Sequence, residues 1–78
     1  MKKKLSELKF GETGVIVKVL SGDLRRRLMD MGLVRGTEIE MVRKSPLGDP
    51  IEFVVKGYHL SLRKAECENV HVEVKKQI

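Results

Sequence analysis

The stretch IEFVVKGYHLSL, residues 51–62, decides the fold class of this 78-residue chain. On both sides of Gly57, apolar side chains stand at every second position, which is the period of a strand with one buried face. Two such runs joined by a tight turn that contains glycine are typical of a β-hairpin. The pattern therefore predicts strands at residues 51–55 and 58–62, with Gly57 in the turn between them.

Three other segments show the same strand pattern. Each is short and contains β-branched or other apolar residues at alternate positions, which suits a half-buried strand. They are residues 15–20, with Val15, Val17 and Val19 on one face; residues 37–44, with Ile39 and Met41 on one face; and residues 70–74, with Val70, Val72 and Val74 on one face. The sequence therefore predicts five strands.

One short helix is predicted after the first strand, over residues 24–31. Residues 21–23 are expected to form a turn in which Asp23 caps the N-terminus of this helix. Gly32 stands where a glycine commonly follows the C-terminus of a helix. Residues 5–8 and 63–68 are each expected to form a single helical turn.

The predicted helix has one apolar face and one cationic face. Met29 falls between Arg25 and Arg26 on the helical wheel, so we expect it to be exposed with a positive charge on either side. The apolar stripe, which is expected to pack on the core, consists of Leu24, Leu28 and Met31.

Five short strands and one short helix predict the all-β class and a small, strongly bent β-barrel. The chain is expected to be a single domain, residues 1–78, with its core at about 5–74 and flexible charged ends. Its three aromatic residues, Phe10, Phe53 and Tyr58, fit core positions of this pattern.

Composition limits the class of protein further. Apolar residues make up 41% and charged residues 35% of the chain, which is ordinary for a folded domain. No apolar run approaches the length of about 20 residues that crosses a bilayer, and no export signal is recognisable. The single cysteine, Cys67, excludes an internal disulfide and multi-cysteine metal sites, which favours the reducing cytoplasm.

The reactive residues do not form a recognisable catalytic or metal-binding constellation. Cys67 would need His59 or His71 to act as a nucleophile, and a buried thiol is the commoner state. Each histidine is at an outward position of its strand without a second ligand at a recognised spacing. We therefore expect no enzyme activity, no cofactor and no metal site, although an adventitious site at His71 and Glu73 stays open.

Two segments are candidate binding surfaces. The net charge of +5 and the run Arg25–Arg27 favour an acidic partner, and the alternative is a merely solvated helix face. A protein partner is favoured over nucleic acid because no aromatic residue is left to stack on bases. The loop Pro46–Pro50 is either a binding loop or a rigid turn made by its two prolines.

Several strings taken together are specific in their order and spacing. They are Leu5-x-x-Leu8-x-x-Gly11, Arg27-Leu28-x-x-Met31-Gly32-Leu33-x-x-Gly36, Pro46-Leu47-Gly48-Asp49-Pro50-Ile51, Leu62-Arg63 with Glu66, and Val70-x-Val72. From about Leu5 to Val74 the chain resembles the FeoA family of bacterial ferrous iron uptake. The resemblance implies an SH3-like barrel and a non-enzymatic cytoplasmic accessory protein that acts with FeoB, a membrane transporter with a cytosolic GTPase domain.

The residue patterns and the resemblance together give the candidate residues. Gly11, Gly32, Gly36 and Gly57 are expected to be structural turns. The candidate partner-binding residues are Arg25, Arg26, Leu28, Met29, Pro46, Leu47 and Asp49, of which Leu28 is also expected to hold the helix on the barrel. The expected contact with the membrane is only through the transporter, and self-association through exposed strand edges is left open.

A second class of function also stays open. The same barrel resembles the C-terminal domain of iron-dependent and manganese-dependent repressors. The alternative is therefore a domain that binds or senses transition metal ions.

Overall fold

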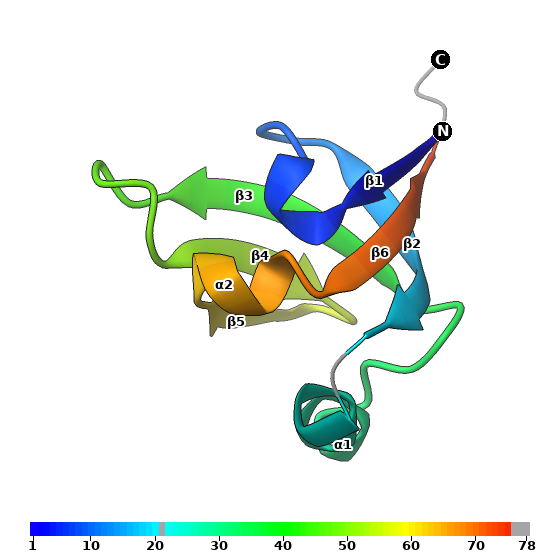
Figure 1. Cartoon of the computed structure of the whole chain (residues 1–78). Coiled ribbons are helices and arrows are strands. Elements are labelled where there is room, and N and C mark those ends of the chain that lie inside the picture. The colour runs from blue at the N-terminus through cyan, green and yellow to red at the C-terminus, as the bar shows by residue number, and fades with distance from the viewer. Residues whose placement is uncertain (21, 76–78) are drawn as a thin grey trace.

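A computed structural model describes residues 1–20 and 22–75 and contains one strongly bent antiparallel sheet (Figure 1). Its strands are β1 (Lys2–Lys4), β2 (Thr13–Val19), β3 (Glu38–Lys44), β4 (Ile51–Val55), β5 (Tyr58–Leu62) and β6 (Val70–Val74). They lie in the order β1-β6-β2-β3-β4-β5. The predicted β class is confirmed, but the sheet is not closed into the predicted barrel, because β1 and β5 remain its two edges.

The hairpin that decided the fold class has the predicted boundaries. Val55 pairs with Tyr58, so the loop has two residues, Lys56 and Gly57, with φ angles of 50° and 85°. Positive φ at both loop positions is the geometry of a type I′ turn, which matches the twist of the flanking strands. The inward set of β4, Ile51, Phe53 and Val55, is buried.

In β2, the predicted inward face is wrong. Ile16 is buried, whereas Val15 and Val17 are only half-buried and lie on the opposite face. The pairing of β2 with β6 shifts register between Ile16 and Lys18, which marks a β-bulge. An extra residue in one strand changes the alternation beyond it, so Val19 packs against the core again.

The N-terminus is not the flexible charged end that we expected. Lys2–Lys4 form β1, which pairs antiparallel with β6. Lys3 Nζ lies 3.2 Å from Glu12 Oε1, and this ion pair is partly buried. At the other end, Lys75 N donates to Thr13 O. Residues 76–78, the rest of the predicted C-terminal tail, lie outside the described part.

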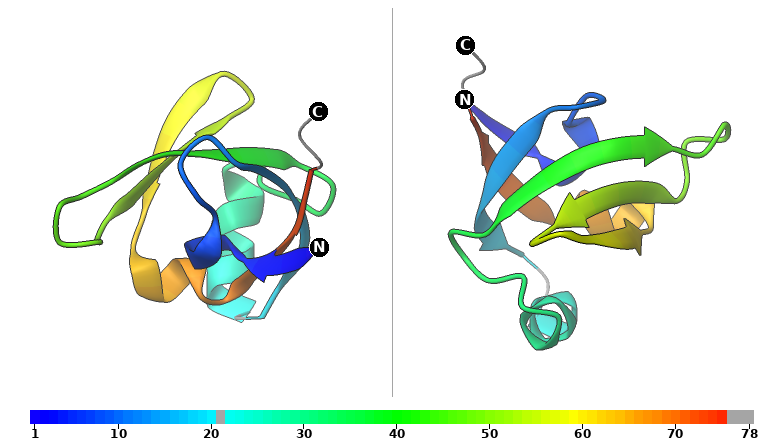
Figure 2. Two further views of the ribbon diagram at one scale, coloured as in Figure 1. Left: turned by 90° about the horizontal axis from the view of Figure 1, so that it is seen from above. Right: turned by 180° about the vertical axis from the view of Figure 1, so that it is seen from behind.

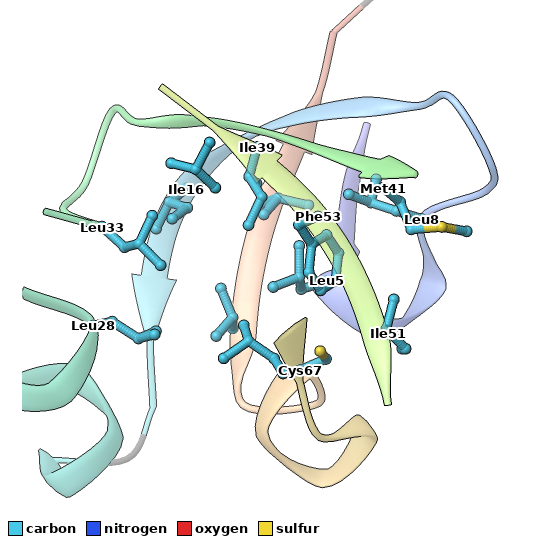
Figure 3. Packing of buried hydrophobic residues seen from close by; sticks show 14 of the residues in the cluster. Leu5, Leu8, Ile16, Leu28, Leu33, Ile39, Met41, Ile51, Phe53 and Cys67 are labelled. Atoms are coloured by element: carbon cyan, nitrogen blue, oxygen red, sulfur yellow. The ribbon is translucent and has the colours of Figure 1, made fainter. Parts of the chain in front are cut away.

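The hydrophobic core lies inside the curve of the sheet (Figure 3). Its open side is covered by the 3₁₀ helix η1 (Leu5–Glu7) and by α2 (Lys64–Cys67), which contact each other. Leu5, Leu8 and Cys67 are buried there. Both predicted helical turns are therefore confirmed, and they cover the side on which the sheet is not closed.

Two of the three aromatic residues are not core residues. Phe53 is buried, but Phe10 is 80% exposed and Tyr58 is 38% exposed. Phe10 lies in a turn closed by the hydrogen bond from Glu12 N to Lys9 O. Tyr58 begins β5 and directs its hydroxyl to the α1 region rather than inward.

The helix α1 (Gly22–Asp30) lies at one end of the sheet, beyond the end of β2 (Figures 1 and 2). It begins two residues earlier than predicted, so Asp23 is in its first turn and is not the cap. There the carboxylate still interacts favourably with the helix dipole. Ser21, which we placed in the preceding turn, lies outside the described residues.

The C-terminus of α1 has the predicted glycine. Gly32 has a φ of 83°, Gly32 N donates to Met29 O and Leu33 N donates to Leu28 O. These two bonds form a Schellman motif, which requires a left-handed residue at the position of Gly32. Positive φ angles are also found at Gly11, Gly36, Gly48 and Gly57.

Candidate functional site

A groove of about 380 Å³ lies between α1, β2 and the segment that follows α1. We call it the α1 groove. Its floor contains the buried apolar residues Ile16 and Leu33, and Met29 and Val34 on its rim are 51% and 43% exposed. It is lined by Ile16, Val17, Lys18, Val19, Arg25, Met29, Leu33, Val34 and Arg35.

The groove exists because β3 separates from β2. The two strands pair only at residues 13–15 of β2. The segment before β3 adds two further bonds, from Ile16 N to Thr37 O and from Gly36 N to Ile16 O. On the N-terminal side of Gly36, the segment leads back to α1 and away from β2. The end of β2 and the helix therefore form two separate walls.

Long-range contacts hold α1 in place. Leu24 and Leu28 are buried against the core. Tyr58 Oη donates a hydrogen bond of 2.6 Å to Met31 O, and Arg27 Nη1 lies 2.6 Å from Glu66 Oε2 of α2. The helix wall of the groove is therefore attached to the core, to β5 and to α2.

The predicted set of contact residues on α1 needs one correction. Arg25, Arg26 and Met29 are exposed, as their positions on the helical wheel indicated. Leu28 is only 1% exposed, because it is on the stripe that packs on the core. Its side chain cannot contact a partner while α1 is docked, so its part in the surface is to hold the helix.

The cations of α1 do not all belong to the groove. Arg25 lines it, whereas Arg26 lines a neighbouring hollow of about 330 Å³ on the outer side of the helix, together with Asp30. Met29 lines both hollows. Arg27 is engaged by Glu66 and is thereby removed from the set of free cations.

Sequence reasoning missed Lys18, Val34 and Arg35. Val34 offered a signal, because Leu33 and Val34 are adjacent apolar residues in a turn, and one residue of such a pair commonly stays at the surface. Leu33 is 1% exposed and Val34 is 43% exposed. Their position opposite β2 depends on the bulge and on the path of the chain after α1, which no local pattern encodes.

The other candidate segment is the loop between β3 and β4. Leu47 is 93% exposed at its tip, and Pro46 is exposed beside it. Gly48 N donates to Ser45 O, and Asp49 Oδ1 accepts a 2.9 Å bond from Lys64 N at the start of α2. Asp49 therefore has a structural task, which is to tie the loop to α2.

The structure does not bring the two candidate segments together. Strand β3 begins near α1 and ends at the loop, and its seven residues span about 20 Å. The loop projects from the end of the sheet that is distant from α1 (Figures 1 and 2). A single small ligand cannot contact both segments, so they are two separate candidate surfaces.

The remaining reactive residues do not form a site. Burial, with a contribution from Glu66, raises the pKa of Cys67 to about 12, so its thiol is not an activated nucleophile. His59 Nδ1 lies 4.0 Å from Glu52 Oε2. Among residues 1–20 and 22–75, no three His, Cys, Asp or Glu side chains gather where they could hold a metal ion.

None of the helices in the described part of the chain is both long enough and apolar enough to span a bilayer. The features that remain are surface features on a small bent sheet. The bent antiparallel sheet and its groove define the class as a small SH3-like β-domain. The model of the FeoA domain family matches residues 3–74, and the chain belongs to this family, which is associated with ferrous iron transport.

Relatives agree with this assignment. The chain is 39% identical over 72 residues to a fusion of Fe(2+) transport protein A and Fe(2+) transporter FeoB from Porphyromonas gingivalis. This match covers 91% of the chain but only 8% of the fusion protein. The FeoA protein of Chlorobium tepidum is 45% identical, with a TM-score of 0.87, over 92% of this chain and 70% of that one.

Two further structures bear on the fold. FeoA of Stenotrophomonas maltophilia, solved with zinc and described as a prokaryotic SH3 domain protein, is 35% identical with a TM-score of 0.76. That match covers 94% of this chain and 89% of the other. A manganese-dependent transcriptional repressor has a TM-score of 0.85 at 13% identity, over 95% of this chain and 37% of the repressor, which shows likeness of fold alone.

Proposed function

We propose that this chain is a non-catalytic accessory domain that binds the FeoB transporter at its cytosolic GTPase region and modulates its activity. The observation that carries the proposal is the fusion protein of Porphyromonas gingivalis, in which a relative of this chain and FeoB are one polypeptide. Covalent fusion keeps two domains at a high effective concentration, which is useful where the domains act on each other.

The surface of the chain supports a protein partner. Arg25, Arg26 and Met29 are exposed on an anchored helix, and Arg and Met are enriched in protein interfaces. The net charge of +5 favours an acidic face on the partner and speeds the encounter at low salt. Association with the transporter is therefore expected to slow as the salt concentration rises.

Modulation follows from differential affinity. A domain that binds one nucleotide state of a GTPase more tightly than another shifts the GTPase toward that state. A domain with equal affinity for all states shifts nothing, however tightly it binds. Binding and modulation are therefore separable parts of the proposal.

The test is a titration of the isotope-labelled chain with the full-length cognate FeoB in lipid nanodiscs, in the presence of GDP or of a non-hydrolysable GTP analogue. We expect binding in at least one state and different affinities in the two. Absence of binding in both states would contradict the proposed partner. Equal affinities would retain the partner and contradict the modulation.

A second candidate function is binding of transition metal ions, and it is favoured by the zinc present in the Stenotrophomonas maltophilia structure. Within the described residues of this chain, the donors do not fit such a site, because His59 and Glu52 lack a third ligand. Calorimetric titration with Zn²⁺, Fe²⁺ and Mn²⁺ separates the two functions. Stoichiometric heat at micromolar metal would favour this candidate over the first.

A further inference from the structure

The α1 groove runs along the edge of a strand. Four consecutive residues of β2, Ile16 to Val19, line it. Side chains alternate between the two faces of a strand, and the bulge between Ile16 and Lys18 shifts this alternation without bringing all four side chains to one face. The four residues line the groove together because it follows the backbone edge of β2.

This edge has no paired strand. Beyond Ile16 the described part of the chain places no strand against β2 on the side of β3, although β6 pairs with the opposite edge as far as Val19. An unpaired edge presents backbone N–H and C=O groups to which a strand can add, and here the bulge between Ile16 and Lys18 interrupts the regular geometry at the start of the edge. Addition of an extended peptide to such an edge is a recurring mode of recognition.

The side chains around this edge define the chemistry of an occupant. Met29 and Val34 supply exposed apolar surface on the wall opposite β2. Lys18, Arg25 and Arg35 supply three positive charges, and none of the three is in an ion pair with a described residue. Other cations nearby are already neutralised, as Arg27 is by Glu66. The groove therefore complements an acidic segment with apolar side chains.

The groove is preformed and has an adequate size. Its volume of about 380 Å³ is within the range of pockets that hold ligands. Both walls are fixed, since β2 is paired with β6 and α1 is attached through Tyr58 and Arg27. A site that is already in place before binding loses little conformational entropy when its ligand arrives.

We propose that the α1 groove takes an extended acidic segment of a partner protein, which adds to the edge of β2 at residues 17–19. An apolar side chain of the segment lies between Met29 and Val34, and its carboxylates face Lys18, Arg25 and Arg35. This inference deepens the proposed function, on which it rests, because the segment then belongs to the transporter.

The first experiment tests the groove without the transporter. The isotope-labelled chain is titrated with two capped hexapeptides of alternating sequence, Glu-Val-Glu-Val-Glu-Val and Lys-Val-Lys-Val-Lys-Val. We expect amide shifts at residues 17–19 and 33–35 with the glutamate peptide, slower hydrogen exchange along the edge of β2, and binding about ten-fold weaker for the lysine peptide. Equal response to both peptides, or shifts confined to the edges of the sheet at β1 or β5, would overturn the proposal.

The second experiment uses the full-length transporter in nanodiscs. Arg25→Glu and Val34→Glu are expected to weaken its binding by about ten-fold or more. Lys64→Glu and Phe10→Glu are the matched controls, because they place the same carboxylate at an exposed cation and at an exposed apolar position outside the groove. We expect the controls to change binding by less than about three-fold. Equal losses in all four variants would overturn the groove as the contact surface.

The two experiments keep the inference and the proposed function apart. If the glutamate peptide binds the groove and the transporter does not bind at all, the proposed partner fails and the groove stands. If the transporter binds and both groove variants bind normally, the groove fails and the partner stands. If the edge of β2 is covered in solution by a second copy of the chain, sedimentation at rising concentration shows it, and the proposed occupant is wrong.

Discussion

The α1 groove and the loop between β3 and β4 both expose large apolar side chains, but they are built differently. The groove joins segments distant in sequence, and its helix is held by buried leucines, by Tyr58 and by Glu66. The loop is closed mainly by bonds within itself, and Leu47 stands at its tip, 93% exposed, with no opposing wall. Both segments are candidates from sequence and each borders a hollow, but Leu47 lies outside the hollow of about 550 Å³ beside the loop, which is lined mainly by charged residues and prolines.

This difference teaches how exposed apolar residues are to be judged. A side chain that lines a preformed groove loses its remaining contact with water when a partner binds, and such positions carry most of the energy of an interface. A side chain at a loop tip must be covered entirely by the partner and loses its freedom on binding. Exposure alone would make Leu47 the strongest candidate contact residue. Position in a hollow instead favours Met29 and Val34, which line the α1 groove.

The largest expected effect breaks the anchor of the groove. Leu28→Ala removes a side chain that is 1% exposed and leaves a cavity between α1 and the core. We expect a loss of about 2 to 5 kcal/mol in the free energy of unfolding. Leu47→Ala, the matched deletion in the loop, is expected to stay within about 0.5 kcal/mol. Thermal and urea unfolding followed by circular dichroism measure both, and similar losses would contradict the contrast between the two regions.

A second effect tests the core on the side of the loop. Cys67 is fully buried at the C-terminal end of α2, the helix to which Asp49 ties the loop. Cys67→Ser places a hydroxyl in an apolar site, which we expect to cost about 1 to 3 kcal/mol in the free energy of unfolding.

In the unmodified chain, the raised pKa and burial of the thiol predict that thiol reagents label Cys67 only after local or global opening. Rapid labelling of the folded chain at pH 8 would contradict this.

Local patterns in the sequence predicted most of the fold. Alternation gave five strands, and Gly57 marked the turn between two of them, because period two and left-handed turns are local properties of the chain. The strand β1 was missed because three consecutive lysines carry no alternation, and only its pairing with β6 makes it a strand. The inward face of β2 was wrong because residues 15–17 are apolar on both faces of the strand, so alternation does not decide between the faces, and the bulge that returns Val19 to the core is visible only against a partner strand.

The candidate site was predicted only in part. The wheel placed Arg25 and Met29 at the surface and Leu28 on the core stripe, since helical periodicity determines which residues share a face. It could not place Val34 or Lys18 beside them, because their proximity results from where β3 leaves β2. Gly14 shows the same limit. A Cβ at this position would lie 2.8 Å from Val72 Cγ2, so the glycine permits a close approach of two strands, which no local pattern reveals.

A smaller effect sharpens the description of the groove. Tyr58→Phe removes only the hydroxyl that donates to Met31 O, and we expect a loss of about 1 kcal/mol in the free energy of unfolding. Because this bond holds the C-terminal end of α1, hydrogen exchange is expected to accelerate in α1 and at residues 31–34 but not at residues 45–50. Equal acceleration in the loop would show that the two regions do not open independently.

The smallest effect concerns the ion pair that links α1 to α2. The pKa of Glu66 lies below its usual value of 4.5, first because Arg63 N donates to the carboxylate and then because Arg27 pairs with it, against the opposing effect of partial burial. A carboxylate with a lowered pKa in the folded chain contributes stability above its usual pKa, and this contribution is lost as the pH falls through the folded value. Since Arg27 is 62% exposed, we expect Glu66→Gln to cost only about 0.5 kcal/mol at pH 7.

The pH dependence distinguishes this ion pair from a packing effect at the same position. The difference in unfolding free energy between Glu66→Gln and the unmodified chain is expected to shrink as the pH falls from 4.5 through the lower pKa of folded Glu66, because the carboxyl group then becomes protonated and is neutral like the amide. Glu68→Gln removes an equal charge from the end of α2, where no ion pair with a described residue is lost, and serves as the control. Urea unfolding between pH 7 and pH 3 measures the difference. If the cost of Glu66→Gln stays constant through this range, Glu66 acts through packing and not through its charge. The ion pair with Arg27 would then not contribute to linking α1 with α2, the helix to which the loop is tied.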